Sequence, residues 1–255
     1  LSSSSAASDV YKRQGLGKSP KDKDPDIYDH RYIHCDVLVV GAGISGILAA
    51  KNAAKNNLKT LLVDEKNELG GATIYQNREF NKIENQSSSD WIKKEIQELK
   101  NLKNLEIKTR TSVAAYHGYN YLLARENLTD HLEKKEKQGK IRQRLLKIRA
   151  KKVILATGAL ERPLIFNNND RPGIMLSSAV KKYADFYGVV SGKKNVFFTN
   201  NDSAYESALC LHNKGIKVEA VIDIRENSGS KIVKAVKDAG IPVSYTHLTL
   251  PTKRI

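Results

Sequence analysis

The sequence predicts an α/β fold, and three observations predict it: a strand–turn–helix–strand pattern, a glycine spacing within it, and a second copy of the pattern. The first copy covers residues 36–64, with an apolar run, an alanine-rich helical stretch and a second apolar run that ends in an acid. The second copy covers residues 195–224. Apolar runs that alternate with helical stretches are typical of βαβ units. We therefore expect a Rossmann-like βαβ domain followed by a second Rossmann-like unit.

The glycines of the first copy, Gly41, Gly43 and Gly46, have the spacing G-x-G-x-x-G. In this spacing the first glycine permits a sharp turn, the second lets backbone amides approach a pyrophosphate, and the third lets the helix lie close to the sheet. The helix N-terminus then presents partial positive charge to the phosphates. Asp64 follows about 20 residues later, where an acid accepts hydrogen bonds from ribose hydroxyls. The pattern predicts a dinucleotide-binding domain of the FAD/NAD(P) type.

The second copy differs at its turn. Asn200, Asn201 and Asp202 stand where the first copy has glycines. An asparagine side chain blocks close backbone approach, and an aspartate at the helix start repels a pyrophosphate. We expect this unit to keep the fold but to be degenerate, without a dinucleotide of its own.

Length and composition favour a soluble globular protein. The 255 residues are 40% hydrophobic, and no apolar run approaches the length of a membrane span, so we expect no membrane partner and a cytoplasmic location. Cys35 and Cys210 stand far apart and form no metal-ligand pattern, which predicts two buried thiols and no metal site. The histidines, His34, His117, His131 and His212 among them, lie in polar or helical surroundings, and we expect no catalytic residue in this chain.

The formal net charge of +15 raises the question of a nucleic-acid partner. Lysines alternate with glutamates over residues 91–103, and no aromatic residues are interleaved with them for base stacking. The basic run at residues 140–152 leads directly into an apolar strand, which favours a strand with a basic edge. We expect no nucleic-acid partner. A noncatalytic basic binding protein stays an alternative, and salt-dependent retention on nucleic acid without any dinucleotide would favour it.

The remaining stretches define the expected domains. Asp90 is a candidate N-cap for a helix with apolar spacing from Trp91 onward, and strands are expected at residues 105–111 and 113–123. The domain boundaries that we expect are an extended lead-in at 15–33, the dinucleotide-binding domain at 34–162, and the second domain at 163–243. Residues 1–14 lack an initiator methionine and resemble a translated adaptor tag, as do residues 244–255, so we expect both ends to be non-native and the chain to be a fragment.

Four segments carry a resemblance to a known family: HRYIHCDVLVVGAGISG, LATGALERPLIF, NDRPGIML and FTNNDSAYESALCL. Over residues 15–243 the sequence resembles the alpha subunits of heterotetrameric sarcosine oxidases. The resemblance implies a noncovalent NAD in this chain, and FAD and FMN in the assembled complex with a beta subunit and smaller subunits. It also implies that the complex demethylates sarcosine oxidatively to glycine, formaldehyde and hydrogen peroxide.

The resemblance, together with the glycine pattern, also assigns a cofactor site. The expected contacts are the turn for the pyrophosphate, the acids and the lysine after the second strand for the ribose, a backbone edge for the adenine, and the ATG segment that closes the site. They are Gly41, Ala42, Gly43, Ile44, Ser45, Gly46, Asp64, Glu65, Lys66, Gly71, Ala72, Val113, Thr157 and Gly158.

Two alternatives remain open. FAD uses the same glycine fingerprint as NAD, so it is not excluded from this site. A related subunit of an opine, hydroxyproline or cyanide-forming amino-acid dehydrogenase shares the pattern ATGA-x-ERP, which stands here at residues 156–163.

Overall fold

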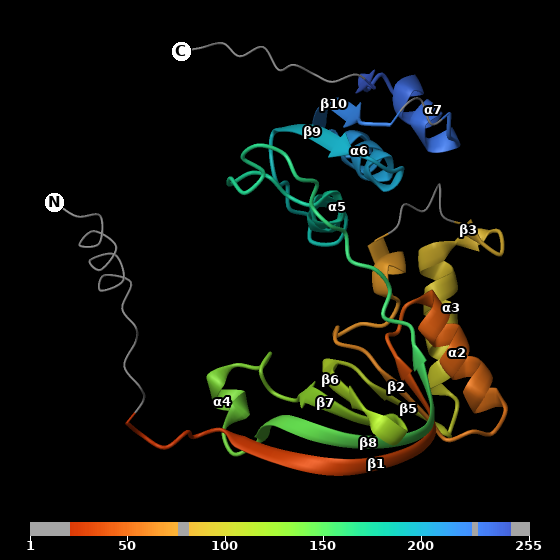
Figure 1. The fold of residues 1–255 in the computed structure, drawn as a ribbon, viewed down its shortest axis with the longest axis vertical. Coiled ribbons are helices and arrows are strands. Elements are labelled where there is room, and N and C mark those ends of the chain that lie inside the picture. Colours follow the sequence, from red (N-terminus) through yellow and green to blue (C-terminus); the bar gives the residue numbers. More distant parts are fainter. Residues whose placement is uncertain (1–20, 76–81, 226–228, 246–255) are drawn as a thin grey trace.

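The computed structural model describes residues 21–75, 82–225 and 229–245. Residues 1–14, expected to be a tag, and all but the first two residues of 244–255 lie outside the described residues. Figure 1 shows two α/β units, one built from residues up to about 155 and one from the teal and blue part of the chain. The strands and helices have the following bounds: β1 Ile27–Val40, α2 Ile44–Lys55, β2 Thr60–Val63, η1 Gly71–Tyr75, β3 Lys82–Ile83, β4 Gln86–Ser87, α3 Ser88–Lys100, β5 Leu105–Lys108, β6 Thr111–His117, η2 Gly118–Asn120, β7 Tyr121–Asn127, α4 Lys134–Lys137, β8 Ile141–Leu155, α5 Ser177–Asp185, β9 Lys194–Thr199, α6 Ser203–Asn213, β10 Lys217–Asp223, α7 Lys231–Asp238 and β11 Val243–Ser244.

The first unit contains a six-stranded sheet in the order β5-β2-β1-β8-β7-β6. Strands β5, β2, β1 and β8 are parallel, and β7 and β6 extend the sheet in antiparallel fashion. Strand β1 begins at Ile27, inside the stretch expected to be a lead-in, and pairs with β8 along its length. The apolar run at its C-terminal end is covered on both faces, which is typical of a central parallel strand. Its N-terminal half is largely exposed, which explains why no strand was evident there from hydropathy.

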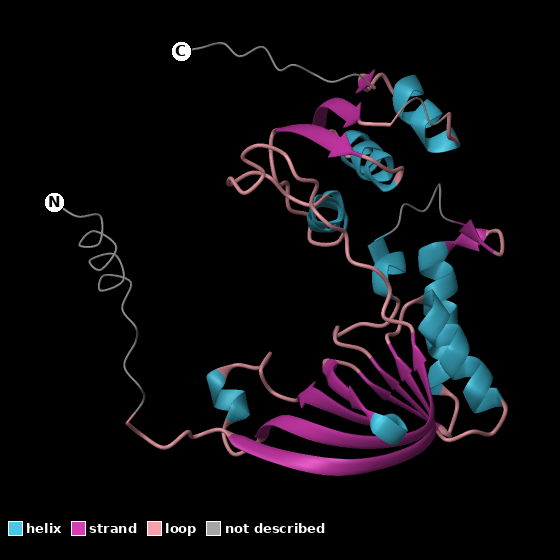
Figure 2. Ribbon diagram, in the orientation of Figure 1, coloured by secondary structure: helices cyan, strands magenta, loops and turns pink. Residues whose placement is uncertain are grey.

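Two apolar clusters hold this unit together. On one side, Val39, Ile47 and Leu62 pack with Trp91 and Leu99, so that helices α2 and α3 cover the parallel strands. On the other side, Leu38 of β1 and Leu61 of β2 belong to a cluster with Leu122 of β7 and Leu146 and Ile148 of β8. Figure 2 shows the two helices along one side of the magenta sheet. The residues at the ends of β1 and β2 are therefore fixed by packing on both faces.

Helix α3 follows the expected apolar spacing, but its start differs from the prediction. It begins at Ser88, and the N-cap is Ser87, whose hydroxyl accepts a hydrogen bond from the Asp90 amide at 3.2 Å. Asp90 lies within the first turn, where its charge favours the helix dipole. Both residue types are good caps, so composition alone did not separate the two positions.

The basic run at residues 140–152 is part of strand β8, as predicted. Three of its cations form ion pairs: Arg142 contacts Asp130 at 2.6 Å, Arg144 contacts Asp29 at 2.8 Å, and Lys151 contacts Asp36 at 2.8 Å. The strand expected at residues 105–111 divides into β5, which ends at Lys108, and β6, which begins at Thr111. Arg110, with φ of 51°, makes the turn between them.

The second unit has three parallel strands in the order β11-β10-β9. Its core joins α6 and α7 to the strands through Tyr205, Leu211, Val221 and Val236, all nearly fully buried. Strand β11 consists of Val243 and Ser244, so it extends one residue into the stretch 244–255, which was expected to be a tag.

A carboxylate from the segment between β8 and α5 holds the N-terminus of helix α5. The N-cap Leu176 offers no side-chain cap. Instead, Glu161 accepts hydrogen bonds from the Ser177 amide at 3.1 Å, the Ser177 hydroxyl at 2.8 Å and the Ser178 amide at 2.9 Å. Burial raises the pKa of Glu161, but these hydrogen bonds outweigh it, and the net effect is a lowered pKa. The charged form of Glu161 thus holds the start of the second unit to the end of the first.

Candidate functional site

The turn between β1 and α2 requires glycine at two positions because the protein itself fills the space. Gly41 has φ of 98°, and a Cβ there would lie 2.3 Å from the Ala156 carbonyl oxygen. A Cβ at Gly46 would lie 1.8 Å from the Gly41 carbonyl oxygen and 3.3 Å from Ala156 Cβ. The third glycine therefore lets the helix approach the turn and the end of β8. Ala156, whose amide donates to the Val40 carbonyl at 2.8 Å, is a packing partner that the sequence did not single out.

Gly43 is different, because a Cβ at this position would have no atom within 4 Å. Its conformation, with φ of −73° and ψ of −174°, is also open to other residues. Gly43 is the N-cap of α2, no side chain caps the helix there, and the first turn contains no acid. The first amides of a helix lack partners within it, so the amides that follow Gly43 face open space. Such a place fits a phosphate group.

The segment after β2 completes one wall of this space. The Gly70 amide donates to the Ala42 carbonyl at 2.7 Å. A Cβ at Gly71 would lie 2.9 Å from Gly43 Cα, so Gly71 lies directly against the turn, while Ala72 is exposed next to it. Gly70, which also has a positive φ of 118°, is a further glycine that the geometry requires.

Asp64 is buried and is bound by backbone on both sides. Its Oδ2 accepts a hydrogen bond from the Ala42 amide at 2.6 Å, and its Oδ1 accepts one from the Lys66 amide at 2.8 Å. Asp64 thus ties the glycine turn to the end of β2, a role that the sequence did not reveal. The contact between Asp64 and a ribose stays a prediction. Each carboxylate oxygen of Asp64 has a second lone pair, which could accept a hydrogen bond from a ribose hydroxyl. Glu65, the next acid, is exposed.

The remaining predicted site residues lie on neighbouring elements. The Thr111 amide donates to the Asp64 carbonyl at 2.8 Å, and Val113 lies two residues further along β6, paired with Ala124. Thr157 and Gly158 are exposed beyond the end of β8, and Thr157 Cα lies 3.2 Å from the position of a Cβ on Gly41. The structure therefore gathers the turn, Asp64, Gly71 and Thr157 at one edge of the sheet, with Val113 one step away.

Next to this edge a cavity of about 360 Å³ lies between the two units. Glu65, Lys66 and Arg110 line it from the first unit, and Lys182 and Tyr187 line it from α5 of the second. Of the histidines, His131 lies in its wall and is exposed, as are His34, His117 and His212. The two cysteines are buried and free, as predicted, and burial raises the pKa of the Cys35 thiol to about 11.

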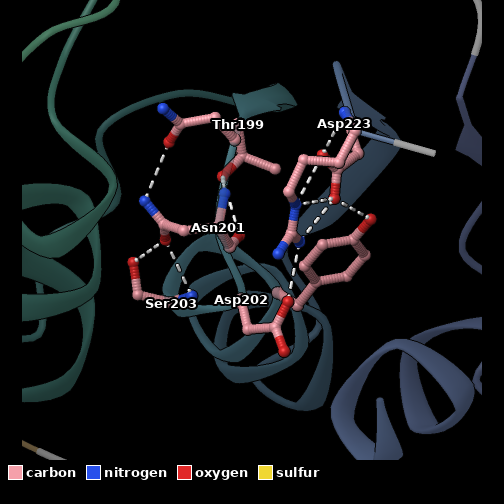
Figure 3. Close-up of polar contacts among 8 residues, drawn as sticks. Thr199, Asn201, Asp202, Ser203 and Asp223 are labelled. Atoms are coloured by element: carbon pink, nitrogen blue, oxygen red, sulfur yellow. Dashed lines mark hydrogen bonds and ion pairs between the residues drawn. The ribbon is translucent and has the colours of Figure 1, made fainter. Parts of the chain in front are cut away.

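The corresponding turn of the second unit is closed by its own side chains (Figure 3). The Thr199 hydroxyl donates to the Asn201 carbonyl at 2.9 Å and accepts from the Asn201 amide at 3.1 Å. The Asn201 side-chain oxygen accepts from the Ser203 amide at 3.0 Å and from its hydroxyl at 2.6 Å. These bonds engage the Ser203 amide at the start of α6 and place side chains where the first unit has open space.

Arg225 adds an ion-pair network above this turn. Its Nη2 lies 2.7 Å from Asp202 Oδ1 and 2.7 Å from Asp223 Oδ2, and the Tyr205 hydroxyl donates to Asp223 at 2.9 Å (Figure 3). Burial acts to raise the pKa of Asp223, but the hydrogen bonds from Arg225 and Tyr205 produce a net lowering. From the sequence, we expected the charge of Asp202 to repel a pyrophosphate. Arg225 compensates that charge, so repulsion by Asp202 does not by itself explain why this turn would bind no dinucleotide. Side chains from β10, its following loop and α6 thus form one connected network next to the turn.

Comparison with known proteins gives a class first. Residues 36–153 match the model of the family FAD dependent oxidoreductase. A more particular relation covers nearly the whole chain. The alpha subunit of sarcosine oxidase from Corynebacterium sp. (strain P-1) is 41% identical over 240 residues, 94% of this chain and 24% of that protein. The alpha subunit from Rhizobium meliloti (strain 1021) is 35% identical over 220 residues, 86% of this chain and 22% of that one. The chain is a homologue of the sarcosine oxidase alpha subunit and spans about a quarter of its length.

Among solved structures, L-proline dehydrogenase from P. horikoshii has a TM-score of 0.61 and 25% identity, and the match covers 80% of this chain and 38% of that one. The predicted fold class and the resemblance stated from sequence are both confirmed. Within residues 21–75, 82–225 and 229–245, no helix has the length and apolar character for a membrane crossing. The same ranges contain no cluster of three or more His, Cys, Asp or Glu side chains suited to a metal ion.

Proposed function

We propose that this chain is the dinucleotide-binding portion of a sarcosine-oxidase-type alpha subunit and that its glycine turn holds NAD through the ADP half. The observation that carries the proposal is the open space at Gly43, next to the uncapped N-terminus of α2. Gly41, Gly46 and Gly71 are required by packing against the protein, whereas nothing in the described part of the chain requires a glycine at position 43. A ligand that needs close backbone approach accounts for a glycine there.

In this proposal the chain binds and positions, and the chemistry belongs to the cofactors and the partner subunit. When bound, a dinucleotide supplies a group that accepts or transfers a hydride. The amides after Gly43 hold the pyrophosphate, and Asp64 and Glu65 contact the adenosine ribose. Val113 pairs its backbone with the adenine edge, and Thr157 and Gly158 close the site. The complete complex, with FAD and FMN and a beta subunit, would convert sarcosine, oxygen and water to glycine, formaldehyde and hydrogen peroxide.

A second candidate is FAD in the same turn, and the match of residues 36–153 to FAD dependent oxidoreductases favours it. The substrate class is the same for both candidates. Sarcosine and proline, named in the relatives and in the similar solved structure, are both secondary amino acids. A secondary amino acid is therefore the proposed substrate of the complex, whichever dinucleotide this chain holds.

The test is to purify the chain, record its visible absorbance, denature it and identify the released nucleotide by mass. NAD without flavin absorbance supports the first candidate, and FAD with flavin absorbance supports the second. If the chain holds neither nucleotide and binds neither when they are added, the proposal is wrong. Retention on nucleic acid that is lost at high salt, without any dinucleotide, would then support a basic binding protein.

A further inference from the structure

Three neighbouring strands, β1, β8 and β7, carry cations and aromatic rings in cross-strand rows on one face. The strand register aligns residues of β1 with β8 and of β8 with β7. We call this surface the basic sheet face, and it consists of the rows His34–Arg149–Tyr121, Tyr32–Lys147–Leu123 and His30–Leu145–Arg125.

This face is open, whereas the opposite face of the same strands is core. Side chains alternate between the two faces of a strand. Leu146 and Ile148 of β8 are fully buried, but Leu145 is 39% exposed and Arg149 is exposed. On β1, Tyr32 is 66% exposed. In Figure 1, β1 and β8 run along the border of the molecule farthest from the second unit.

The charge of the face is one-sided. The three rows contain Arg125, Lys147 and Arg149 and no carboxylate, and all of their residues lie in the described part of the chain. At the margin of the face, Lys151 pairs with Asp36 at 2.8 Å. Two other cations of β8, Arg142 and Arg144, are compensated by aspartates. Lys147 donates a hydrogen bond to the Tyr32 hydroxyl at 3.2 Å, and Arg149 donates one to the Tyr119 carbonyl at 3.2 Å, and neither acceptor carries a negative charge. Within the described residues the positive charge of the basic sheet face is therefore not neutralised by a carboxylate on the face.

The aromatic rings on this face are already paired with its cations. Lys147 Nζ lies 4.9 Å from the centroid of the Tyr32 ring, and Arg149 Cζ lies 5.0 Å from that of Tyr121. The basic run at residues 140–152 contains no aromatic residue, because the rings come from β1 and β7, whereas Lys147 and Arg149 come from β8. Tyrosine and arginine are enriched at the energetic centres of protein interfaces.

We propose that the basic sheet face is a docking surface for an acidic protein surface, such as that of a companion subunit. Charge complementarity identifies the partner as anionic. The pairing of the rings favours protein over nucleic acid, because base stacking on Tyr32 or Tyr121 would displace the cation that each ring holds. The face is separate from the glycine turn, at the other end of β1, so the inference does not depend on which nucleotide is bound.

The test compares two double charge reversals with the same change in formal net charge. The first is Arg125→Glu with Arg149→Glu on the face, and the control is Lys94→Glu with Lys103→Glu, two exposed lysines outside it. The probes are an oligoglutamate peptide, as an acidic polypeptide, and a single-stranded oligouridylate of equal length. Binding is measured at low and at physiological ionic strength, and carbodiimide cross-links to oligoglutamate are mapped by mass.

We expect the face variant to weaken oligoglutamate binding by about tenfold or more, with little effect of the control. We also expect cross-links at Lys147. An equal loss in both variants would overturn the proposal, because net charge alone would then explain binding. Tighter oligouridylate binding that only the face variant abolishes would assign the face to nucleic acid instead. Thermal unfolding checks both proteins, and Arg125→Ala with Arg149→Ala replaces the reversal if that variant does not fold. The released nucleotide should be unchanged in all of them.

Discussion

Replacing Gly43 with alanine should weaken nucleotide binding while leaving the fold intact. The added Cβ meets no protein atom within 4 Å, and the backbone at Gly43 suits alanine. A glycine-to-alanine change at such a position stabilises a protein by about 0.4–1 kcal/mol, because it restricts the unfolded chain. The same Cβ projects into the space assigned to the pyrophosphate. The variant therefore separates binding from stability, which most substitutions in a packed turn do not.

The size of the binding loss follows from the hydrogen bonds at stake. A hydrogen bond to a charged group contributes about 1.5–3 kcal/mol. Loss of one phosphate–amide bond therefore lowers affinity by about 10- to 100-fold. Gly46→Ala is the informative comparison, because its Cβ would lie 1.8 Å from the Gly41 carbonyl oxygen. Overpacking of this kind costs about 1–3 kcal/mol. Gly46→Ala should lose both affinity and stability.

The assay is calorimetric titration with NAD and with FAD, alongside thermal unfolding. Each kcal/mol lost lowers the midpoint by about 2–4 °C in a chain of this size. Gly118→Ala is the control, because its Cβ also meets nothing within 4 Å and lies far along the chain from the turn. If Gly43→Ala binds nucleotide as tightly as the unchanged chain, the space next to Gly43 does not hold the pyrophosphate, and the reasoning fails.

Three further predictions concern buried or bound carboxylates. Glu161→Gln should destabilise the start of α5 by about 0.5–2 kcal/mol. Because the pKa of Glu161 is lowered in the folded state, the stabilisation that its carboxylate provides is present above the unfolded-state pKa and is lost as pH falls through the folded-state pKa. The difference in unfolding midpoint between the unchanged chain and Glu161→Gln should therefore shrink in acid. Arg225→Ala should destabilise the second unit by about 1–3 kcal/mol, with Arg225→Lys intermediate, since lysine lacks the fork that spans two aspartates; an unchanged urea midpoint would contradict this. Asp64→Asn should lose about 1–3 kcal/mol, because an amide cannot accept from two backbone N–H groups on separate oxygens; equal stability would show that those bonds are dispensable.

The glycine turn was predictable because its requirements are local. Gly41 is required by the sharp turn, and Gly46 is required by its close approach to Gly41, only five residues away. The apolar runs on both sides of the turn predict the two strands. The start of α3 was harder to predict, because Ser87 and Asp90 are both good capping residues and lie within one turn of each other. The long N-terminal half of β1 was missed because its exposed polar and aromatic residues do not read as a buried strand.

Other features depend on residues far apart in the sequence. Arg225 reaches Asp202 across the second unit, and Ala156 meets Gly41 although more than a hundred residues separate them. Asp64 was predicted as a ligand contact, but its bonds to the Ala42 and Lys66 amides depend on backbone placement that composition does not encode. The rows of the basic sheet face exist only through strand register.

Strands β1 and β8 run side by side from Tyr28 and Gln143 to Val40 and Leu155, a ladder about 40 Å long. One end lies under the glycine turn, and the other lies beneath the basic sheet face. Because a single hydrogen-bonded ladder spans both, the two ends belong to one cooperative unit, and their amides should exchange with solvent hydrogen at a common free energy of opening. A ligand that stabilises this unit at either end would then slow exchange along its whole length.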